Sequence, residues 1–577
     1  MAVGGMMKTS TSKTLVIIKI NFIFFVFLLV AYLSLLLKPS AISQDRASSS
    51  ISGCGFRDCH VKKVGEGKKK TGEKRMVTEV IPNFFNKLHG NSSIALINIG
   101  EGELLDWGAL GDATSIKFER VSENLKWEDI FPEWIDEEEE NEGPYCPEIP
   151  MPDFSVYGEF DVVAARVPCR RPEQGWSRDV FRLQVHLIAA NLALRRGKRD
   201  GRGAVKVVFY GGCRPMMEVF RCDDMVEREG EWWLYELESG RLEEKVAMPV
   251  GSCKLALPLW REGAINEEFD ASKLAKSGVA SGRREAYATL IHSSDTYVCG
   301  AITLAQSIRK TGSKRDLLLL HDKSIPEIKL RALAAAGWQL REIKRIRNPR
   351  AQRNTYNEYN YSKFRLWLLT DYQKVVFVDA DIVVLRNLDL LFTFPQISAA
   401  GNDGVIFNSG IMVLEPSACT FEALMKNRKQ IISYNGGDQG FLNEIFVWWH
   451  RLPRRVNFLK NFWSNKTAEM TMKNRLFASD PPKLYSIHYL GLKPWLCHRD
   501  YDCNWNREDQ KVYASDPAHR RWWRAHDEMD DSLKRFCGLS EKRKRGLEME
   551  RKRAEELGFS DGHWRINIAD RSSSRNL

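Results

Sequence analysis

Apolar residues form one unbroken run near the N-terminus and shorter periodic segments along the rest of the chain. Residues 20–37 contain no charged side chain, and a run of about 18 apolar residues can span the hydrocarbon core of a bilayer. Lys8, Lys13 and Lys19 precede this run, whereas the first acidic residue is Asp45. The positive-inside rule keeps such an N-terminus cytoplasmic and sends the rest of the chain into a lumen. The pattern predicts a single-pass, type II signal anchor.

A cleaved signal peptide is the alternative to this anchor. Ser40, Ala41 and Ser43 are small residues of the kind found at cleavage sites. The apolar segment of a signal peptide usually has about 7–15 residues, however, and this run is longer. We therefore expect residues 1–19 to be a cytoplasmic tail and residues 20–37 to remain as the transmembrane anchor.

Between the anchor and residue 285 the apolar pattern is weaker. Residues 38–80 are rich in Ser, Gly and Lys, which is typical of a flexible stem. Residues 81–284 are expected to form an accessory lumenal region, with a helix over 178–195 and a strand over 204–210. The sequence of this region indicates no particular chemistry.

From residue 285 onwards, apolar runs of strand length alternate with helical patterns. Strands are predicted over 286–291, 316–321 and 374–378, and helices over 299–310 and 328–336. This alternation is typical of an α/β fold with an open, mainly parallel sheet, in which ligands bind at the carboxyl ends of the strands. A catalytic domain is expected over 285–536. A charged tail over 537–577 follows, with a solvated helix near 540–557.

Two carboxylates directly follow the third of these strands. Asp379 and Asp381 are separated by Ala380, so both side chains can reach one hard divalent cation that prefers oxygen ligands. Such an ion would bridge a nucleotide diphosphate and neutralise charge on the leaving group. Taken alone, an Asp-x-Asp pattern is more often a turn. Two acids at the end of a buried strand would be costly without a counter-charge, which favours a metal site.

Three polar clusters farther along the chain are spaced like separate loops on one sheet. They are residues 408–410, before an apolar strand; residues 435–440, before a helical run over 441–449; and residues 488–493, with an imidazole, a glycine and a cation. Each has a structural interpretation: a polar turn, a helix N-cap at Asp438, and a structural histidine. In the functional interpretation, glycines let backbone approach a sugar, His488 completes a manganese site and Lys493 pairs with phosphate.

Over residues 285–510 the chain resembles glycosyltransferase family 8, the glycogenin-like retaining enzymes. The resemblance is carried by Asp295, Tyr297 and residues 361–363, 379–381, 408–410, 437–440 and 488–495. It implies a GT-A fold, a Rossmann-like nucleotide-sugar transferase domain, with Mn²⁺ bound by Asp379, Asp381 and His488. Lys363 corresponds to a lysine important for activity in the family, and the region of Tyr297 corresponds to the loop that faces uracil.

The resemblance also implies a set of residues that hold the UDP-sugar. They are Asp379, Ala380, Asp381, Asn408, Ser409, Gly410, Asn435, Gly436, Gly437, Asp438, Gln439, His488, Tyr489, Leu490, Gly491, Leu492 and Lys493. Two departures from glycogenin accompany it. Glycogenin has an acid where Asn435 stands, and it has one more residue between the positions that match Gly491 and Lys493. Together with the anchor, these differences point away from soluble glycogen priming.

A narrower resemblance extends beyond the catalytic domain. The anchor and the segments 146–152 and 488–495 are together similar to the plant glucuronosyltransferases that decorate xylan. This resemblance covers much of residues 140–540. It implies an enzyme of the Golgi membrane that transfers α-glucuronic acid from UDP-glucuronate to xylose units of a xylan backbone, with retention of configuration.

Two routes to retention stay open. In a front-face route the acceptor hydroxyl attacks on the side of the leaving group, while the metal and Lys493 carry the diphosphate charge. A double displacement would need a carboxylate beside the anomeric carbon, and Asp438 is the candidate for it. We hypothesise the front-face route, with Asp438 orienting the donor or acceptor. Lys363 and Arg365 are candidates for binding the glucuronate carboxylate.

Other functions compete with this one. Another lumenal family 8 enzyme could use UDP-glucose, UDP-galacturonate or a different acceptor, and a non-catalytic glycan-binding protein could share the fold. Three metal ligands speak against the binding protein, which would have no use for them. Trp463 and Trp495 could stack on xylose rings, although packing in the core is the better expectation.

Charge and cysteine content add two constraints. The formal net charge is +11. It suits a protein that binds an anionic ligand or a membrane surface; alternatively, the excess basic residues lie in the tails and stem. No nucleic-acid-binding motif accompanies it, so no nucleic-acid partner is expected.

Twelve cysteines are compatible with an oxidising lumen, with Cys54–Cys59 and Cys497–Cys503 as local disulfide candidates. N-x-S/T sequons occur at Asn91, Asn360 and Asn465; we expect Asn360, in the active-site region, to stay bare.

Overall fold

The computed structural model describes residues 82–84, 92–100, 107–108, 110–132, 146–169, 178–253, 255–256, 282–402, 405–462, 467–559 and 561–566. The expected tail, anchor and stem lie outside these residues, as do Cys54, Cys59, Asn91, Trp463 and Asn465. What was predicted for them stays a prediction. Within the described ranges, no helix combines the length and the apolar character needed to cross a bilayer.

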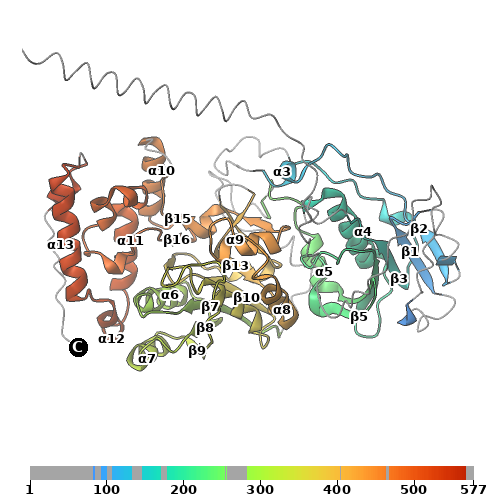
Figure 1. The fold of residues 1–577 in the computed structure, drawn as a ribbon, viewed down its shortest axis with the longest axis horizontal. Helices are drawn as coiled ribbons and strands as arrows, with labels where there is room; N and C mark the ends of the chain where they lie inside the picture. Colours follow the sequence, from blue (N-terminus) through green and yellow to red (C-terminus); the bar gives the residue numbers. More distant parts are fainter. Residues whose placement is uncertain are drawn as a thin grey trace, which may run out of the picture. The chain divides into compact units, whose positions relative to one another are not determined.

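The accessory region contains a six-stranded sheet with the order β2-β1-β3-β4-β6-β5. Figure 1 draws this region in blue to green. Its elements are β1 (Ser93–Ile97), β2 (Asp112–Ser115), α3 (Trp127–Ile130), β3 (Val162–Arg166), α4 (Val180–Arg196), β4 (Ala204–Tyr210), β5 (Met225–Glu229), β6 (Trp232–Glu238) and α5 (Ser239–Val246). β2, β1, β3 and β4 run parallel, β6 is antiparallel to β4, and β5 is antiparallel to β6. The predicted helix and strand of this region are confirmed as α4, which Asp179 caps at its N-terminus, and β4.

The catalytic region is built on a seven-stranded sheet with the order β14-β12-β13-β10-β7-β8-β9. Its elements are β7 (Glu285–Ile291), α6 (Val298–Lys310), β8 (Asp316–His321), α7 (Glu327–Ala335), β9 (Gln339–Glu342), η8 (Asn360–Leu368), β10 (Lys374–Val378), β12 (Ser398–Gly401), β13 (Phe407–Leu414), α8 (Ala418–Asn427), α9 (Asp438–Ile445) and β14 (His450–Leu452). β10, β7, β8 and β9 are parallel, and β13 is antiparallel to β10. The three predicted strands and two predicted helices are confirmed.

The central strands are apolar along their whole length because both faces of the sheet are covered. On β10, Val375 and Phe377 belong to one core, which also contains Phe364 of η8. Val376 and Val378 belong to the opposite core, with the apolar side chains of α6. Alternate residues of a strand therefore point to two different layers, and the strand ends where Asp379 leaves the core.

A small third sheet, β11-β16-β15, extends from the end of β10. It comprises β11 (Ile382–Val384), β15 (Phe458–Leu459) and β16 (Ser486–His488), and the helices that follow in the C-terminal half are α10 (Thr467–Ala478), α11 (Asp516–Asp527), α12 (Asp531–Lys534) and α13 (Glu541–Glu556). The expectation that the last helix is solvated is wrong for one of its faces. Leu547 of α13 is fully buried against Cys497, Tyr501 and Cys503.

Two further local predictions are also wrong. Residues 408–410 do not form a turn, because they are already paired within β13, where their side chains are buried. The helix predicted over 441–449 begins earlier and ends at Ile445. Trp448 and Trp449 leave the helical path because both are almost fully buried, and the Trp448 indole donates to the carbonyl of Val250 in the accessory region.

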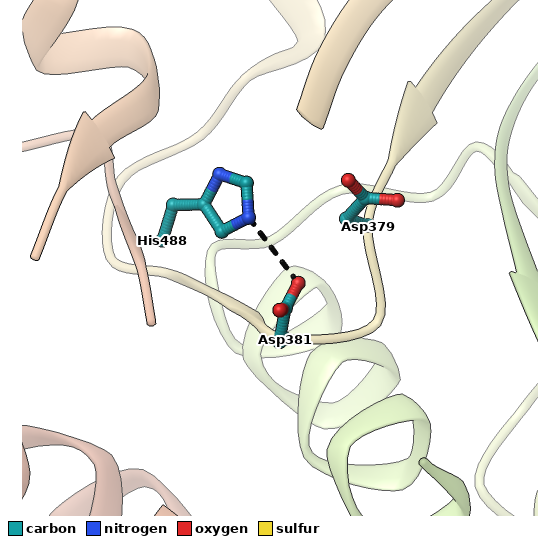
Figure 2. A group of neighbouring side chains, drawn as sticks. All are labelled: Asp379, Asp381 and His488. Atoms are coloured by element: carbon teal, nitrogen blue, oxygen red, sulfur yellow. Dashed lines mark ion pairs between the residues drawn. The ribbon is translucent and has the colours of Figure 1, made fainter. Parts of the chain in front are cut away.

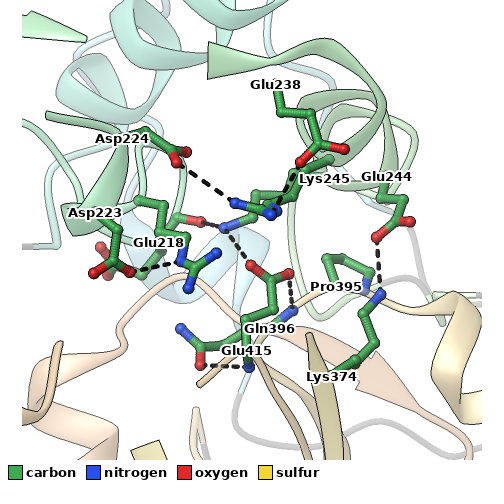
Figure 3. Close-up of polar contacts among 12 residues, drawn as sticks. Glu218, Asp223, Asp224, Glu238, Glu244, Lys245, Lys374, Pro395, Gln396 and Glu415 are labelled. Carbon is green, nitrogen blue, oxygen red and sulfur yellow. Dashed lines mark hydrogen bonds and ion pairs between the residues drawn. The ribbon is translucent and has the colours of Figure 1, made fainter. Parts of the chain in front are cut away.

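Buried charges join the accessory region to the catalytic sheet (Figure 3). Lys374, at the start of β10, pairs with Glu244 of α5 at 2.8 Å, and both side chains are more than nine-tenths buried. Lys245 of α5 donates to the carbonyl of Glu218 and lies 3.9 Å from the carboxylate of Glu415, which follows β13. Burial acts to raise the pKa of Glu415, but Lys245 and Lys374 outweigh it and hold that pKa below its usual value.

Disulfides reinforce the same assembly. The described cysteines pair as Cys146–Cys253, Cys169–Cys213, Cys222–Cys419, Cys299–Cys537 and Cys497–Cys503. The predicted local bridge between Cys497 and Cys503 is confirmed. Cys222–Cys419 joins the accessory region to α8 of the catalytic region across 197 residues of sequence. The other long-range pairs could not be read from spacing.

We expect Lys374→Ala to destabilise the protein strongly. Removing Lys374 takes away one of the two cations that pair with the buried Glu244 carboxylate and leaves Arg283 as the other, so we expect a loss of about 2–3 kcal/mol, less than the roughly 3–5 kcal/mol for a fully unpaired buried charge. Chemical denaturation would measure the change, with Lys544→Ala as the control, because Lys544 pairs with the exposed Glu541. That surface variant should lose less than about 1 kcal/mol. Equal losses in the two variants would contradict the role of the buried pair.

Candidate active site and metal centre

The end of β10 and the short sheet beside it bring two carboxylates and an imidazole together (Figure 2). Asp379 and Asp381 flank the turn between β10 and β11. Ile382 of β11 pairs with His488 of β16, so the imidazole lies next to Asp381, with Nε2 3.4 Å from Oδ1. The backbone N–H of Tyr489 also donates to the carbonyl of Asp381. Strand pairing, not sequence proximity, therefore positions His488.

These three side chains fit a divalent cation. One ligand atom from each of Asp379, Asp381 and His488 lies within 4.8 Å of the others. Two carboxylates and a neutral imidazole form a donor set suited to metals such as manganese. Burial raises the pKa of Asp379 to about 6. Burial also acts on Asp381, but Lys493 and His488 outweigh it and hold that pKa well below its usual range.

The imidazole is held from behind by an amide chain that sequence reasoning missed. His488 Nδ1 lies 3.2 Å from Asn457 Oδ1, and Asn457 Nδ2 donates to Asn408 Oδ1 at 2.8 Å. Nε2 is then the nitrogen that faces Asp381, as in metal sites where a second-layer partner orients the histidine. Asn457 follows no recognisable motif, so only the fold could identify it.

Gly410 has a specific steric role here. A Cβ at this position would lie 2.5 Å from Cε1 of His488, so a larger residue would displace the imidazole. The backbone N–H of Gly410 donates to Asn408 Oδ1, and its carbonyl accepts from the N–H of Asp379. The predicted cluster 408–410 thus lies against both the carboxylate and the imidazole of the candidate metal site.

Lys493 reaches the site from the turn after β16. Its Nζ lies 2.6 Å from Oδ2 of Asp381 and also donates to the carbonyl of Tyr489. Gly491 makes this turn possible, because it has a positive φ of 74° and a Cβ there would lie 2.5 Å from Asn504. The Lys493 ammonium also lies 6.0 Å from the centre of the Tyr297 ring.

A second lysine lies between two carboxylates on the other side of Asp379. Lys363 Nζ is 2.7 Å from Asp438 Oδ2 and 3.5 Å from Asp379 Oδ1. It also donates to the carbonyl and the hydroxyl of Ser409. Burial acts to lower the pKa of Lys363, but the two carboxylates outweigh it and keep that pKa above its usual value. Lys363 is therefore a buried, charged bridge.

Asp438 does not cap α9. The N-cap residue is Gly437, which has no side chain to cap the helix, and Asn435 Oδ1 instead accepts from the N–H of Gly440 in the first turn. The Asp438 carboxylate instead accepts from the Ser409 hydroxyl at 3.1 Å and pairs with Lys363. Gln439 Oε1 accepts from the backbone N–H of Ser409. The structure therefore contradicts the interpretation of Asp438 as a helix N-cap.

The residues just before Asp438 are uncharged, and their contacts fix the conformation of the loop. Asn435 Oδ1 accepts from the backbone N–H groups of Gly437 and Gly440. Gly436 has a φ of 66°, and its carbonyl accepts from Asn348 and Asn357. These contacts fix the loop that carries Asp438 and Gln439 into the site.

Several other predicted residues lie away from the carboxylates. Tyr489 is fully buried and donates to the carbonyl of Ala518, and Leu492 packs against the α13 cluster. Trp495 is 3% exposed and donates to the carbonyl of Thr296, so it packs in the core as expected. Arg365 donates to the carbonyl of Lys344 and lies over the ring of Phe421.

Comparisons with known proteins agree with this arrangement. Residues 68–253 match the family described as the GUX1-5 N-terminal domain, and residues 288–399 match glycosyl transferase family 8. UDP-glucuronate:xylan alpha-glucuronosyltransferase 2 of Arabidopsis thaliana is 54% identical over 98% of this chain and 97% of that protein. The chain belongs to the UDP-glucuronate:xylan α-glucuronosyltransferase family.

A second member of this family, UDP-glucuronate:xylan alpha-glucuronosyltransferase 1 of Arabidopsis thaliana, is 46% identical over 86% of this chain and 73% of that protein. Among solved structures, the galactosyltransferase LgtC with donor and acceptor sugar analogues covers 44% of this chain and 99% of that chain, at 16% identity and a TM-score of 0.30. That likeness is too distant to inform the site. The family matches confirm a family 8 UDP-sugar transferase with a GT-A-like α/β fold.

We expect a divalent cation together with UDP to stabilise the protein against heat. A ligand that binds only the folded state stabilises it by about 2.7 kcal/mol at about one hundred times its Kd. Asp381→Asn should abolish the shift in Tm that Mn²⁺ produces. Asp509→Asn is the matched control, because Asp509 pairs with Arg507 on the surface. A shift that persists in Asp381→Asn would show that the metal binds elsewhere.

Proposed function

We propose that the chain transfers α-glucuronic acid from UDP-glucuronate to xylose units of a xylan backbone. One observation carries this proposal: a group of the half-buried Asp379 and the buried Asp381 and His488, flanked by two lysines, lies in a chain 54% identical over almost its whole length to a protein named for that reaction. Other family 8 donors would use the same metal group, so the donor sugar is the point to test. A non-catalytic protein would have no need for this group of ligands.

The metal in this proposal is Mn²⁺, held by Asp379, Asp381 and His488. When bound, it supplies Lewis-acid chemistry that offsets charge on the diphosphate of the donor. Lys493 lies beside Asp381 and provides a second cation for the departing UDP. Because this lysine and the carboxylates are held in place before the donor arrives, little reorganisation is needed when charge develops.

The remaining residues position the sugar. Lys363 holds Asp438 and Ser409 in one hydrogen-bonded group at the edge of the sheet. Asp438 in this group is already engaged by an ammonium and a hydroxyl, which lowers its capacity to attack an anomeric carbon. We therefore favour a front-face reaction in which the acceptor hydroxyl attacks on the side of the leaving group. Asp438 and Gln439 orient sugar hydroxyls in this scheme.

The proposed location is the Golgi lumen, with the chain held by a single-pass anchor over residues 20–37. Five disulfides among the described cysteines suit an oxidising compartment. Asn360 lies within η8, and its amide would be 3.4 Å from a Cβ at Gly437. A glycan there would crowd the donor loop, which supports the prediction that Asn360 stays bare.

The protein should transfer radiolabelled glucuronate from UDP-glucuronate to xylo-oligosaccharides when Mn²⁺ is present, and EDTA should stop the transfer. Asp381→Ala should lower kcat/KM about 10³-fold, the equivalent of about 4 kcal/mol. UDP-glucose and UDP-galacturonate are the competing donors in the assay. Transfer from one of them in place of UDP-glucuronate would keep the site and refute the proposed donor.

Lys493→Met should lower kcat about 10²- to 10³-fold with a much smaller change in KM. The ammonium would stabilise charge that develops as the diphosphate leaves, so its effect belongs to the transition state. Steady-state kinetics with varied UDP-glucuronate would measure the two constants. Lys483→Met is the control, because Lys483 is an exposed lysine earlier in the same segment. A rise in KM with unchanged kcat would assign Lys493 to ground-state binding only.

A further inference from the structure

A glucuronate donor brings a third negative charge that the residues described so far do not neutralise. Lys363 is saturated by Asp438, Asp379 and Ser409. Lys493 pairs with Asp381, and Arg365 contacts Lys344 and Phe421. A buried carboxylate without a partner would be costly. If the proposed function holds, another cation must lie within reach of the sugar.

The geometry of the sheet shows where to look. β10, β7, β8 and β9 are consecutive parallel neighbours, so their carboxyl ends share one edge. Ala288 and Leu290 of β7 and Leu318 and Leu320 of β8 face the same core as Phe377 of β10. By strand alternation, His292 and Asp322 then project to the same side of the sheet as Asp379.

Spacing between strands sets the distances along this edge. Neighbouring strands lie about 4.8 Å apart and residues along a strand about 3.3 Å, so Asp322, two strands across and two residues beyond the level of Asp379, is about 12 Å away. His292 directly follows β7, the strand between them. This interval is adjacent to Asp379, the carboxylate that would help to hold the metal. It is also the side on which Lys363 and Asp438 lie.

Arg345 enters this interval from the segment that follows β9. Its Nε lies 3.1 Å from Asp322 Oδ2, and its Nη1 donates to the Ser293 hydroxyl at 3.2 Å. The guanidinium also stacks over the ring of Tyr359, with Cζ 4.0 Å from the ring centre. His292 Nδ1 lies 2.7 Å from the same Ser293 hydroxyl.

The backbone at this cluster is held in an uncommon conformation. Ser293 has a φ of 67°, in the left-handed region that a serine rarely adopts, and its N–H donates to Asp322. Backbone strain of this kind persists where surrounding contacts enforce it, often at functional sites. Here it presents one hydroxyl to both the imidazole and the guanidinium.

We propose that Arg345, with His292 beside it, binds the carboxylate of the glucuronate in the donor and so selects a sugar acid over a neutral hexose. A guanidinium has five N–H donors, so it can hold Asp322 with one edge and a second carboxylate with another. Arg345 Nη2 donates no hydrogen bond to any residue that the structure describes. Its side chain is 36% exposed and therefore accessible to a ligand.

Other cations nearby are less suitable. Lys329 pairs with Asp295 at 2.5 Å, and Arg347 pairs with Glu358 and the carbonyl of Ala351. His292 is half-buried, and its electrostatic neighbours are Asp322, Arg345, Asp438 and Lys363, which places it between the cluster and the donor-binding group. Burial lowers the pKa of His292, so it acts as a neutral hydrogen-bond partner.

The test is the selectivity of donor binding. Calorimetry with the full chain and Mn²⁺ would give Kd values for UDP, UDP-glucose and UDP-glucuronate. Arg345→Met should weaken UDP-glucuronate binding about 10- to 100-fold, since hydrogen bonds to charged groups are of that strength. Binding of UDP and UDP-glucose should change less than about 3-fold by the same reasoning, because neither has the carboxylate. Arg345→Lys should restore part of the loss.

Arg353→Met is the matched control. Arg353 is an exposed arginine of the same segment and should leave all three Kd values unchanged. If Arg345→Met lowers the affinity for all three ligands equally, or raises only the KM for the xylan acceptor, the assignment to the donor carboxylate is wrong. If the wild-type protein itself does not prefer UDP-glucuronate to UDP-glucose, the proposed function fails first. A preference that survives in Arg345→Met refutes this inference alone.

Discussion

Three carboxylates, two buried and one half-buried, at one edge of a sheet impose the main constraint on this protein. Asp379, Asp381 and Asp438 face two ammonium groups, since Lys363 bridges the first and third and Lys493 pairs with the second. Acids so close together in a buried site cannot all stay ionised without nearby cations. The two lysines lower the electrostatic cost of ionising the three carboxylates. One negative charge remains unbalanced, and a divalent cation would offset it. Fold and chemistry therefore depend on the same set of charges.

The accessory region acts at the opposite end of the same strands. Lys374 begins β10 and pairs with Glu244 of α5, whereas Asp379 stands immediately after the end of that strand. Glu415, just after the antiparallel β13, also lies at the edge that faces the accessory region. Buried ion pairs are weak sources of net stability but demand a specific arrangement. The interface can thus fix the register of the catalytic strands without occupying the active site.

The apolar pattern of the sequence predicted strands correctly where the residues it makes apolar are also the residues that the fold buries. The strands over 285–291, 316–321 and 374–378 are apolar on both faces, and the structure buries both faces. The failures have tertiary causes. Residues 408–410 are polar, yet they lie inside β13. Asn457 donates a hydrogen bond to the buried Asn408 side chain, and the His488 imidazole packs against Gly410. The charged helix α13 was expected to be solvated, but Leu547 and Ala554 are buried on it.

The sequence by itself determined the order of strands and helices, the pair of acids after β10 and the resemblance to family 8. These features are local, since periodicity and adjacent residues encode them. Only the tertiary structure decided that His488 lies against Asp381, that Asp438 pairs with Lys363 instead of capping a helix, and that Arg345 lies on Asp322. Each of these contacts joins residues brought together by strand pairing and packing across the chain. Such contacts depend on which strands pair and which loops meet, and a local pattern does not specify either.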